Sequence, residues 1–244
     1  MAQVLLALTR TQSSKQDLME GKLTVGYWHI RGLAAPLRMM CVYSGVPFEN
    51  ATYIVNGEPG SWDTSAWLKD AKPALKAKNS LMNLPYVIDG DVVVTQSQAC
   101  LQYLARKLGL YGEGVVENAN VDQISSEVMD LRNGAVGVFY GGGLDKFYEN
   151  TVPVSYGKFE SWLEQQGTVY TVGPKPTAGD FHLWEMLDQH EMCAKDQGFA
   201  SPIANFPRLQ ALYEAFRKEP TLESYFNGDM YKLSVNNKMA VWGA

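Results

Sequence analysis

The chain has 244 residues and a formal net charge of −5 at pH 7, a length that allows one large domain or two small ones. Hydrophobic residues make up 46% and charged residues 19% of the chain, which is ordinary for a soluble globular protein. We find no basic patch of the kind that binds nucleic acid, and no apolar run approaches the roughly 18 residues of a membrane span. We therefore expect neither a nucleic-acid partner nor a membrane anchor.

The cysteines Cys41, Cys100 and Cys193 are far apart and form no CxxC pair. Their odd number and their spacing indicate a reducing compartment and argue against a disulfide framework or a structural zinc site. Because the chain also has only 3 histidines, we expect no metal centre.

Residues 1–21 differ from the rest and are predicted to be an N-terminal extension. A short apolar run is followed by basic and hydroxyl residues, with no acid before Asp17. The run is too short, and lacks the basic start, for a secretory signal peptide. We expect a cytoplasmic protein with a poorly ordered extension, and organellar targeting by residues 1–21 stays open as an alternative.

Regular patterns begin at Leu23. Residues 22–28 alternate as in a strand, and a helix is predicted from about Ala34, with Pro36 in its first turn and Gly45 as its stop. The segments that follow are a strand at 48–55, a turn-rich loop and a helix at 63–72.

Two short β segments, 84–90 and 91–96, are joined by Asp89-Gly90, a strong hairpin signal. An amphipathic helix follows, with Ser97 as its expected N-cap. The order β-α-β-α-β-β-α over residues 22–108 predicts a small mixed sheet with helices packed on it.

No convincing strand occurs after residue 110. Residues 109–119 read as a linker, and residues 120–244 as an all-helical domain in which Thr177 and Asp180 form a capping box. The predicted fold class is α/β plus all-α. The expected helices are 117–140, 154–166, 177–194, 206–217 and 220–226.

Five segments carry a family resemblance. "GYWHIRGLAAPLR", "NLPYVIDG", "TQSQACLQYLARK", "VMDLRNGAVGVFY" and "KMAVWG" occur in this order between residues 23 and 243, and together they resemble a mu-class glutathione transferase. The resemblance implies a thioredoxin-like N-terminal domain that binds glutathione and a helical domain that binds an electrophile. It also implies a homodimer, with glutathione as co-substrate and no other cofactor.

Tyr27 matches the family's catalytic tyrosine. From the sequence alone, a buried aromatic at a strand end would be the favoured interpretation. A thiol with a pKa near 8.5 is only a few per cent thiolate at pH 7, and lowering that pKa by about two units requires about 2.7 kcal/mol. A phenol O–H directed at the sulfur supplies about 1.5 to 3 kcal/mol.

Trp28, Trp67 and Lys72 match the family's contacts to the glycine end of glutathione, through indole N–H donors and an ammonium. The alternatives are two core tryptophans and a solvated lysine. This chain has extra residues between Trp67 and Asn83, so Lys69 is a second candidate for the role of Lys72.

Asn83, Leu84 and Pro85 match the segment that pairs with the cysteinyl backbone of glutathione. The family's proline has a cis peptide bond, and the resulting turn exposes the N–H and C=O of Leu84. An ordinary turn asparagine is the alternative for Asn83.

Gln96 and Ser97 lie where a strand ends and a helix begins. The free N–H groups of a helix N-terminus favour a carboxylate, which suits the γ-glutamyl end of glutathione. Asp130 matches the acid that reaches the γ-glutamyl ammonium from the neighbouring subunit; its alternative is a solvated helix face.

The electrophile pocket is expected to contain Ile30, Leu33, Val136, Tyr140 and Asn237, and Leu33 is also assigned to the glutathione site. Tyr140 matches a second catalytic residue that donates to oxygen-bearing electrophiles.

The chain departs from the family pattern at three places, two in the electrophile half of the site and one at the dimer contact. Gly141–Gly143 follow Tyr140 directly and loosen the backbone. Asn236 and Asn237 replace an aromatic and a serine, which predicts a more polar pocket. Leu81 replaces the phenylalanine that usually fills an apolar socket of the partner subunit, and a leucine buries less area there than a phenylalanine.

We therefore predict a glutathione transferase that conjugates the glutathione thiolate to small electrophiles in detoxification. Two alternatives use the same residues: a glutathione-dependent isomerase, which also needs Tyr27, and a ligand-binding homologue without useful turnover.

Overall fold

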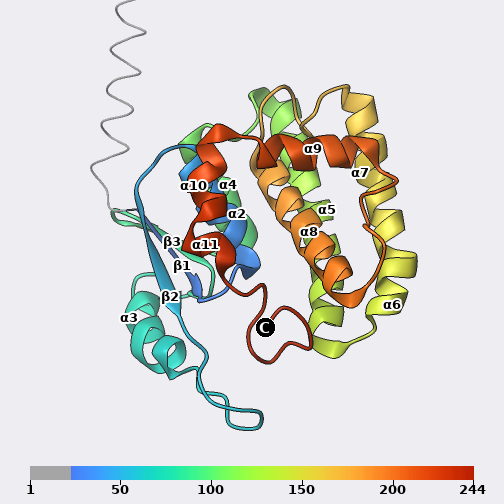
Figure 1. Cartoon of the computed structure of the whole chain (residues 1–244). Helices are drawn as coiled ribbons and strands as arrows, with labels where there is room; N and C mark the ends of the chain where they lie inside the picture. The colour runs from blue at the N-terminus through green and yellow to red at the C-terminus, as the bar shows by residue number, and fades with distance from the viewer. Residues whose placement is uncertain (1–22) are drawn as a thin grey trace, which may run out of the picture.

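The computed structural model describes residues 23–244, so the N-terminal extension predicted for residues 1–21 lies outside the described residues. The chain forms a sheet-containing part followed by a helical part (Figure 1), as the sequence predicted. The four strands are β1 (Leu23–Trp28), β2 (Phe48–Tyr53), β3 (Tyr86–Asp89) and β4 (Val92–Thr95).

The sheet has the strand order β2-β1-β3-β4. β1 runs parallel to β2 and antiparallel to β3, and β3 and β4 form the predicted hairpin. Gly26 in β1 allows the ring of Tyr86 to lie across the strand, because a Cβ at Gly26 would be 2.1 Å from Tyr86 Cζ. Tyr86 in turn stacks on Trp67, with ring centroids 5.9 Å apart.

The helices of this part partly match the prediction. α2 (Ala35–Tyr43) follows a 3-10 turn η1 (Gly32–Ala34) and has Pro36 in its first turn, as expected. The helix predicted at 63–72 is instead a π-helical turn η2 (Ala66–Ala71) that continues into α3 (Lys72–Lys76).

The first residue of α4 (Ser97–Leu108) corrects another prediction. Ser97 is already inside the helix, and Gln96 is its N-cap. Among residues 23–244, Gln96 is also the one non-glycine residue with positive φ, at 74°. The helix therefore begins after an unusual backbone turn rather than with a serine cap.

The helical part begins earlier than expected, because α5 starts at Gly114 and so takes in residues 114–119 of the predicted linker. A helical stretch at 144–151 and a short helix at 229–232 were not predicted. The elements are α5 (Gly114–Gly141), α6 (Leu144–Lys146), η3 (Phe147–Thr151), α7 (Val152–Gln166), α8 (Ala178–Gln197), α9 (Pro207–Arg217), η4 (Pro220–Leu222), α10 (Glu223–Asn227) and α11 (Asp229–Lys232).

α8 is the central helix of the molecule, and residues 178–190 are all buried. Its start is the predicted capping box of Thr177 and Asp180. The Asp180 carboxylate accepts from the backbone N–H groups of Thr177 (2.8 Å) and Thr171 (2.7 Å). Since α8 packs against α5 and also against α2, one hydrophobic core runs through both parts of the chain.

Three further observations concern the described residues. Cys41, Cys100 and Cys193 are buried free thiols. In residues 23–244, no group of three or more His, Cys, Asp or Glu side chains is arranged to hold a metal ion. Within the same range, no helix is both long and apolar enough to cross a membrane.

Candidate functional site

Tyr27 lies near the carboxyl end of β1, and only 6% of its surface is exposed. Gly32 lies against its ring. A Cβ at Gly32 would be 2.6 Å from Tyr27 Cε1 and 3.1 Å from its hydroxyl oxygen. Gly32 also has φ +40°, so glycine is needed here both for its backbone conformation and for the close approach.

The phenol of Tyr27 is held in its neutral form. Burial raises the pKa of Tyr27, while the Arg132 guanidinium and the backbone N–H of Leu33 partly oppose this effect. A neutral phenol has an O–H to donate at physiological pH. This is the protonation state that the predicted role requires.

The segment that follows Tyr27 is fixed by the buried side chain of Arg38 on α2. Its guanidinium donates to the carbonyl oxygen of Ile30 (2.7 Å), to that of Trp28 (3.4 Å) and to Asn50 Oδ1 (2.8 Å). Charge-assisted bonds of this kind are the stronger ones in proteins. The hydrogen bonds from the Arg38 guanidinium therefore stabilise the turn between β1 and α2.

Arg31, in the same turn, joins the sheet part to α8. Its fully buried guanidinium donates to both carboxylate oxygens of Glu185, at 3.0 and 2.8 Å, and to Asp188 at 2.6 Å. Burial raises the pKa of Glu185, and the Arg31 charge opposes this. Gln189 adds a donor to Glu185 at 2.7 Å.

The C-terminal tail crosses the same turn (Figure 1). The N–H groups of Arg31 and Gly32 donate to the carbonyl oxygens of Ser234 (2.8 Å) and Val235 (3.2 Å). Further on, the N–H groups of Val241 and Trp242 donate to the carbonyl oxygen of Phe139 on α5. The tail thus bridges the Tyr27 turn and the end of α5.

The hairpin places Asn83 next to the start of α4. The buried Thr95 hydroxyl accepts from the Asn83 N–H (3.0 Å) and donates to its C=O (2.7 Å), while the Asn83 side chain stays exposed. The Leu84–Pro85 peptide bond is cis, as expected. Thr95 was not predicted as a site residue, although a buried threonine directly before Gln96 is a readable signal.

Ser97 is half-buried and Gln96 is exposed at the N-terminus of α4. The N–H of Cys100 bonds to the Gln96 carbonyl at 2.8 Å, whereas the N–H groups of the first turn have no partner of this type in a helix. The positive φ of Gln96 is a costly conformation of the kind found at functional sites.

The predicted contacts to the glycine end of glutathione lie around η2. Trp28 is half-buried, and Trp67 is 1% exposed in a small core with Tyr86 and Met82. The Lys72 ammonium lies 5.9 Å from the Trp67 ring centroid, whereas Lys69 is exposed. The position beside Trp67 favours Lys72 over Lys69, and a contact between Trp67 and the ligand stays a prediction.

α5 presents Arg132, Val136 and Tyr140 at four-residue intervals, which places them on one helix face. All three are half-buried, and Arg132 interacts electrostatically with both Tyr27 and Tyr140. Arg132 is the main residue that the sequence analysis missed. Its spacing from Val136 and Tyr140 was the signal that could have identified it.

Tyr140 is tied to the tail, because its hydroxyl oxygen accepts the backbone N–H of Asn237 at 3.0 Å. The glycines after it close the helix: the Gly142 N–H bonds to the Val138 carbonyl, and Gly142 and Gly143 both have positive φ. Tyr140 therefore stays on the last turn of α5, with its hydroxyl oriented.

Asn236 corrects the prediction of a polar tail. It is 4% exposed, and its side-chain amide donates to the Trp242 carbonyl at 3.0 Å. Its backbone N–H bonds to the Gly243 carbonyl at 2.7 Å. It therefore holds the turn of the tail, and only Asn237 can add polarity to the pocket.

The remaining predicted residues divide into two groups. Ile30 is buried near Gly32, and Leu33 is half-buried beside Tyr27, so both lie close to the phenol. Asp130 is exposed on α5, and Leu81 is 70% exposed at the edge of the sheet part. Both side chains are accessible to solvent in the single chain.

Two family models match the chain: "Glutathione S-transferase, N-terminal domain" over residues 23–106 and "Glutathione S-transferase, C-terminal domain" over residues 129–229. Glutathione S-transferase Mu 3 of Homo sapiens is 33% identical over 228 residues, covering 92% of this chain and 96% of the relative. Glutathione S-transferase Mu 5 of Mus musculus is 32% identical over 225 residues, covering 91% and 96%.

Solved structures agree with this. The glutathione S-transferase Blo t 8 superposes with a TM-score of 0.75 at 26% identity, covering 91% of this chain and 100% of that one. The Pi-class enzyme of Onchocerca volvulus gives 0.74 at 26%, covering 90% and 99%. The chain belongs to the glutathione S-transferase family. Within it, the sequence relatives named above are of the Mu class.

Proposed function

We propose that the protein conjugates glutathione to small electrophiles by attack of the glutathione thiolate, as a detoxifying transferase. The observation that carries this proposal is the buried neutral phenol of Tyr27, fixed beneath Gly32 and faced by Arg132 and Tyr140. One hydrogen bond from this phenol to the sulfur, worth about 1.5 to 3 kcal/mol, favours the thiolate over the thiol. Deprotonation of bound glutathione is then followed by formation of the carbon–sulfur bond.

Glutathione is proposed to lie across the carboxyl end of β1 and the amino end of β3, which are neighbours because the two strands are antiparallel. Its glycine carboxylate meets Trp28, Trp67 and Lys72, where the ammonium supplies the matching charge. Its cysteinyl backbone pairs with Leu84. Its γ-glutamyl carboxylate meets the N-terminus of α4, whose free N–H groups favour an anion. The proposed contacts within one chain are Tyr27, Trp28, Leu33, Trp67, Lys72, Asn83, Leu84, Pro85, Gln96 and Ser97.

The electrophile is proposed to lie between the Tyr27 turn and α5. Ile30, Leu33 and Val136 supply apolar contacts, and Asn237 adds a polar edge. The cation of Arg132 and the hydroxyl of Tyr140 are placed to stabilise negative charge that develops on the electrophile as the thiolate adds.

The working form is proposed to be a cytoplasmic homodimer. Asp130 would complete the γ-glutamyl site of a second copy. This role is consistent with the exposure of its carboxylate in the single chain. Leu81 supplies an exposed apolar side chain of the kind that an interface buries.

Tyr27→Phe tests the function. We expect turnover with 1-chloro-2,4-dinitrobenzene to fall about tenfold to hundredfold, which corresponds to the loss of one bond to a charged acceptor. Ultraviolet absorbance of bound thiolate should show a raised thiol pKa, while the KM for glutathione changes little. Tyr103→Phe, which removes a hydroxyl bonded to Asp89, is the matched control and should retain activity.

Two results would change the conclusion. Unchanged turnover in Tyr27→Phe would contradict the role of this phenol. Retention of the native protein on glutathione-agarose without turnover would indicate a ligand-binding homologue. The isomerase alternative has no observation in its favour, and the relatives named above are transferases.

A further inference from the structure

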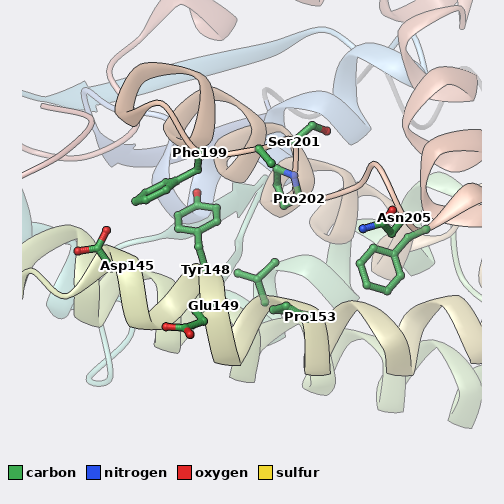
Figure 2. A pocket seen from close by; sticks show the side chains of 11 residues that line it. Asp145, Tyr148, Glu149, Pro153, Phe199, Ser201, Pro202 and Asn205 are labelled. Carbon is green, nitrogen blue, oxygen red and sulfur yellow. The ribbon is translucent and has the colours of Figure 1, made fainter.

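A cavity lies in the helical part of the chain, and Figure 2 shows the side chains that line it. The elements around it are on the side of the helical part away from the sheet (Figure 1). Its volume is about 400 Å³, within the range of roughly 300–1,000 Å³ of small-molecule sites. It opens between the loop after α8 and the stretch from α6 to the start of α7. The residues that define its chemistry are Asp145, Tyr148, Glu149, Pro153, Phe199 and Phe206.

Flat aromatic surfaces form its walls. Tyr148 and Phe199 stack with centroids 4.9 Å apart at 28°, and the Tyr148 hydroxyl donates to the His190 carbonyl at 2.9 Å. Phe206 packs edge-on against buried Tyr156 at 5.5 Å. Because Tyr148 and Phe206 are held by contacts behind the cavity, they present fixed faces to an occupant.

Two carboxylates stand at its edge. Asp145 and Glu149 are four residues apart on consecutive helical turns, and both are exposed (Figure 2). Neither carboxylate has a hydrogen-bond or ion-pair partner among residues 23–244. By contrast, nearby Glu191 already accepts from Ser201 Oγ (2.9 Å) and the Ile203 N–H (3.1 Å). Two carboxylates that pair with no described residue therefore lie at the cavity mouth.

The backbone beneath the cavity is also unusual. Tyr148 and Glu149 lie in η3 (Phe147–Thr151), a π-helical turn, and such turns frequently occur at functional sites. The other π-helical turn within the described part of the chain is η2, which carries Trp67 of the proposed glutathione site. The wider turn brings an aromatic face and a carboxylate to the same cavity.

We propose that this cavity binds a small organic cation that carries a flat apolar group, of the arylalkylammonium class. The aromatic walls bury the flat group and attract its cation through their π faces, while Asp145 and Glu149 supply the opposite charge. The negative net charge of the protein raises the local concentration of such cations. The site is separate from Tyr27 and does not depend on the proposed transferase activity.

The test uses 2-phenylethylammonium as the probe and 2-phenylethanol as its neutral counterpart, measured by calorimetry and saturation-transfer NMR. The full chain is first saturated with S-hexylglutathione, which fills the proposed transferase site. We expect the cation to bind still, and to bind more tightly than the alcohol. The double variant Asp145→Asn/Glu149→Gln should weaken the cation about fivefold, as expected for partly exposed ion pairs, and leave the alcohol unchanged.

A matched control removes the same charge elsewhere. Asp91→Asn/Glu223→Gln changes two exposed carboxylates on the hairpin and on α10, and it should not alter binding. Phe199→Ala should weaken both probes, because it removes an aromatic wall. The proposal is overturned if the cation does not bind, if S-hexylglutathione displaces it, or if both double variants weaken it equally.

Discussion

The proposed transferase site has a sheet side, formed by Tyr27, Gly32 and Gln96, and a helix side, formed by Arg132, Val136 and Tyr140. The geometry of the two sides is set by different means. On the sheet side, backbone conformation sets the geometry. Gly32 has positive φ and lies against the Tyr27 ring, and Gln96 holds a positive φ before α4. A ligand contacting these positions meets main-chain groups whose places do not depend on flexible side chains.

On the helix side, side chains and the tail set the geometry. Arg132, Val136 and Tyr140 share one face of α5, and the Tyr140 hydroxyl is oriented by the Asn237 N–H. We expect substitutions of these side chains to change the chemistry of the site more than the fold. If the proposed function holds, we expect the sheet side to serve glutathione with every electrophile and the helix side to decide which electrophiles react.

The largest expected effect comes from the ion cluster that joins the two sides. Arg31→Met leaves the buried carboxylates of Glu185 and Asp188 together without their cation, and it should lower the free energy of unfolding by about 4 kcal/mol. Urea unfolding followed by circular dichroism measures this loss. Arg208→Met is the control, because its guanidinium is 3.9 Å from Glu164 and partly exposed. A loss below about 1 kcal/mol for Arg31→Met, as for a surface pair, would show that the cluster does not hold the two sides together.

Gly32→Ala tests the sheet side alone. The added methyl would lie 2.6 Å from Tyr27 Cε1 on a backbone with φ +40°, so the phenol must move. A displacement of about 1 Å can cost about 100-fold in rate, and we expect a loss of that size in kcat/KM for every electrophile. Gly141→Ala is the control, since its Cβ meets no atom within 4 Å. A loss confined to one class of electrophile would contradict the comparison.

The partner contact on the sheet side is tested with Leu81→Ser. Burying a leucine side chain contributes about 2 kcal/mol, and a two-fold dimer contains two copies of Leu81, so the variant should raise the dimer dissociation constant by up to about a thousandfold. Mass photometry over a dilution series measures this constant, and activity should fall in parallel as Asp130 leaves the neighbouring site. Leu68→Ser, at a leucine with 51% exposure, should change neither. A native protein that is monomeric throughout would contradict the dimer.

The sheet side was predictable where local signals agree with the fold. The strand alternation before Tyr27, the Asp89-Gly90 turn and the Pro36 helix start all appear as expected. The cap of α4 was assigned to Ser97 because serine is a preferred cap and glutamine is not. The structure places Gln96 there instead, in a positive-φ conformation that residue propensity does not predict.

The helix side was less predictable because its geometry depends on contacts distant in sequence. Tyr140 and Asn237 are 97 residues apart, and only the folded tail brings them together. Asn236 and Asn237 look equivalent in the sequence, yet one is buried in the turn of the tail and the other reaches Tyr140. The spacing of Arg132 from Val136 and Tyr140 places it on the same helix face. Its proximity to Tyr27 could not be predicted from that spacing, because Tyr27 belongs to the other domain.

Tyr140→Phe is the smallest change and tests the helix side most directly. The Asn237 N–H occupies a lone pair of the hydroxyl, so the O–H proton is free to donate to the oxygen of an enone or epoxide. Removing this donor should lower kcat/KM about tenfold for 4-phenyl-3-buten-2-one, the value of one bond to a developing charge.

The same variant should change kcat/KM for 1-chloro-2,4-dinitrobenzene by no more than about twofold. In that reaction the added negative charge is spread over the ring and two nitro groups, whose oxygens are weakly basic and need no proton from Tyr140. The ratio of the two kcat/KM values is the measurement, and it cancels any general loss of active protein. Tyr103→Phe should leave this ratio unchanged. An equal loss of kcat/KM with both electrophiles would mean that Tyr140 acts by positioning the tail rather than by donating its proton. Tyr140 would then not select between electrophiles, which would contradict the comparison of the two sides at this residue.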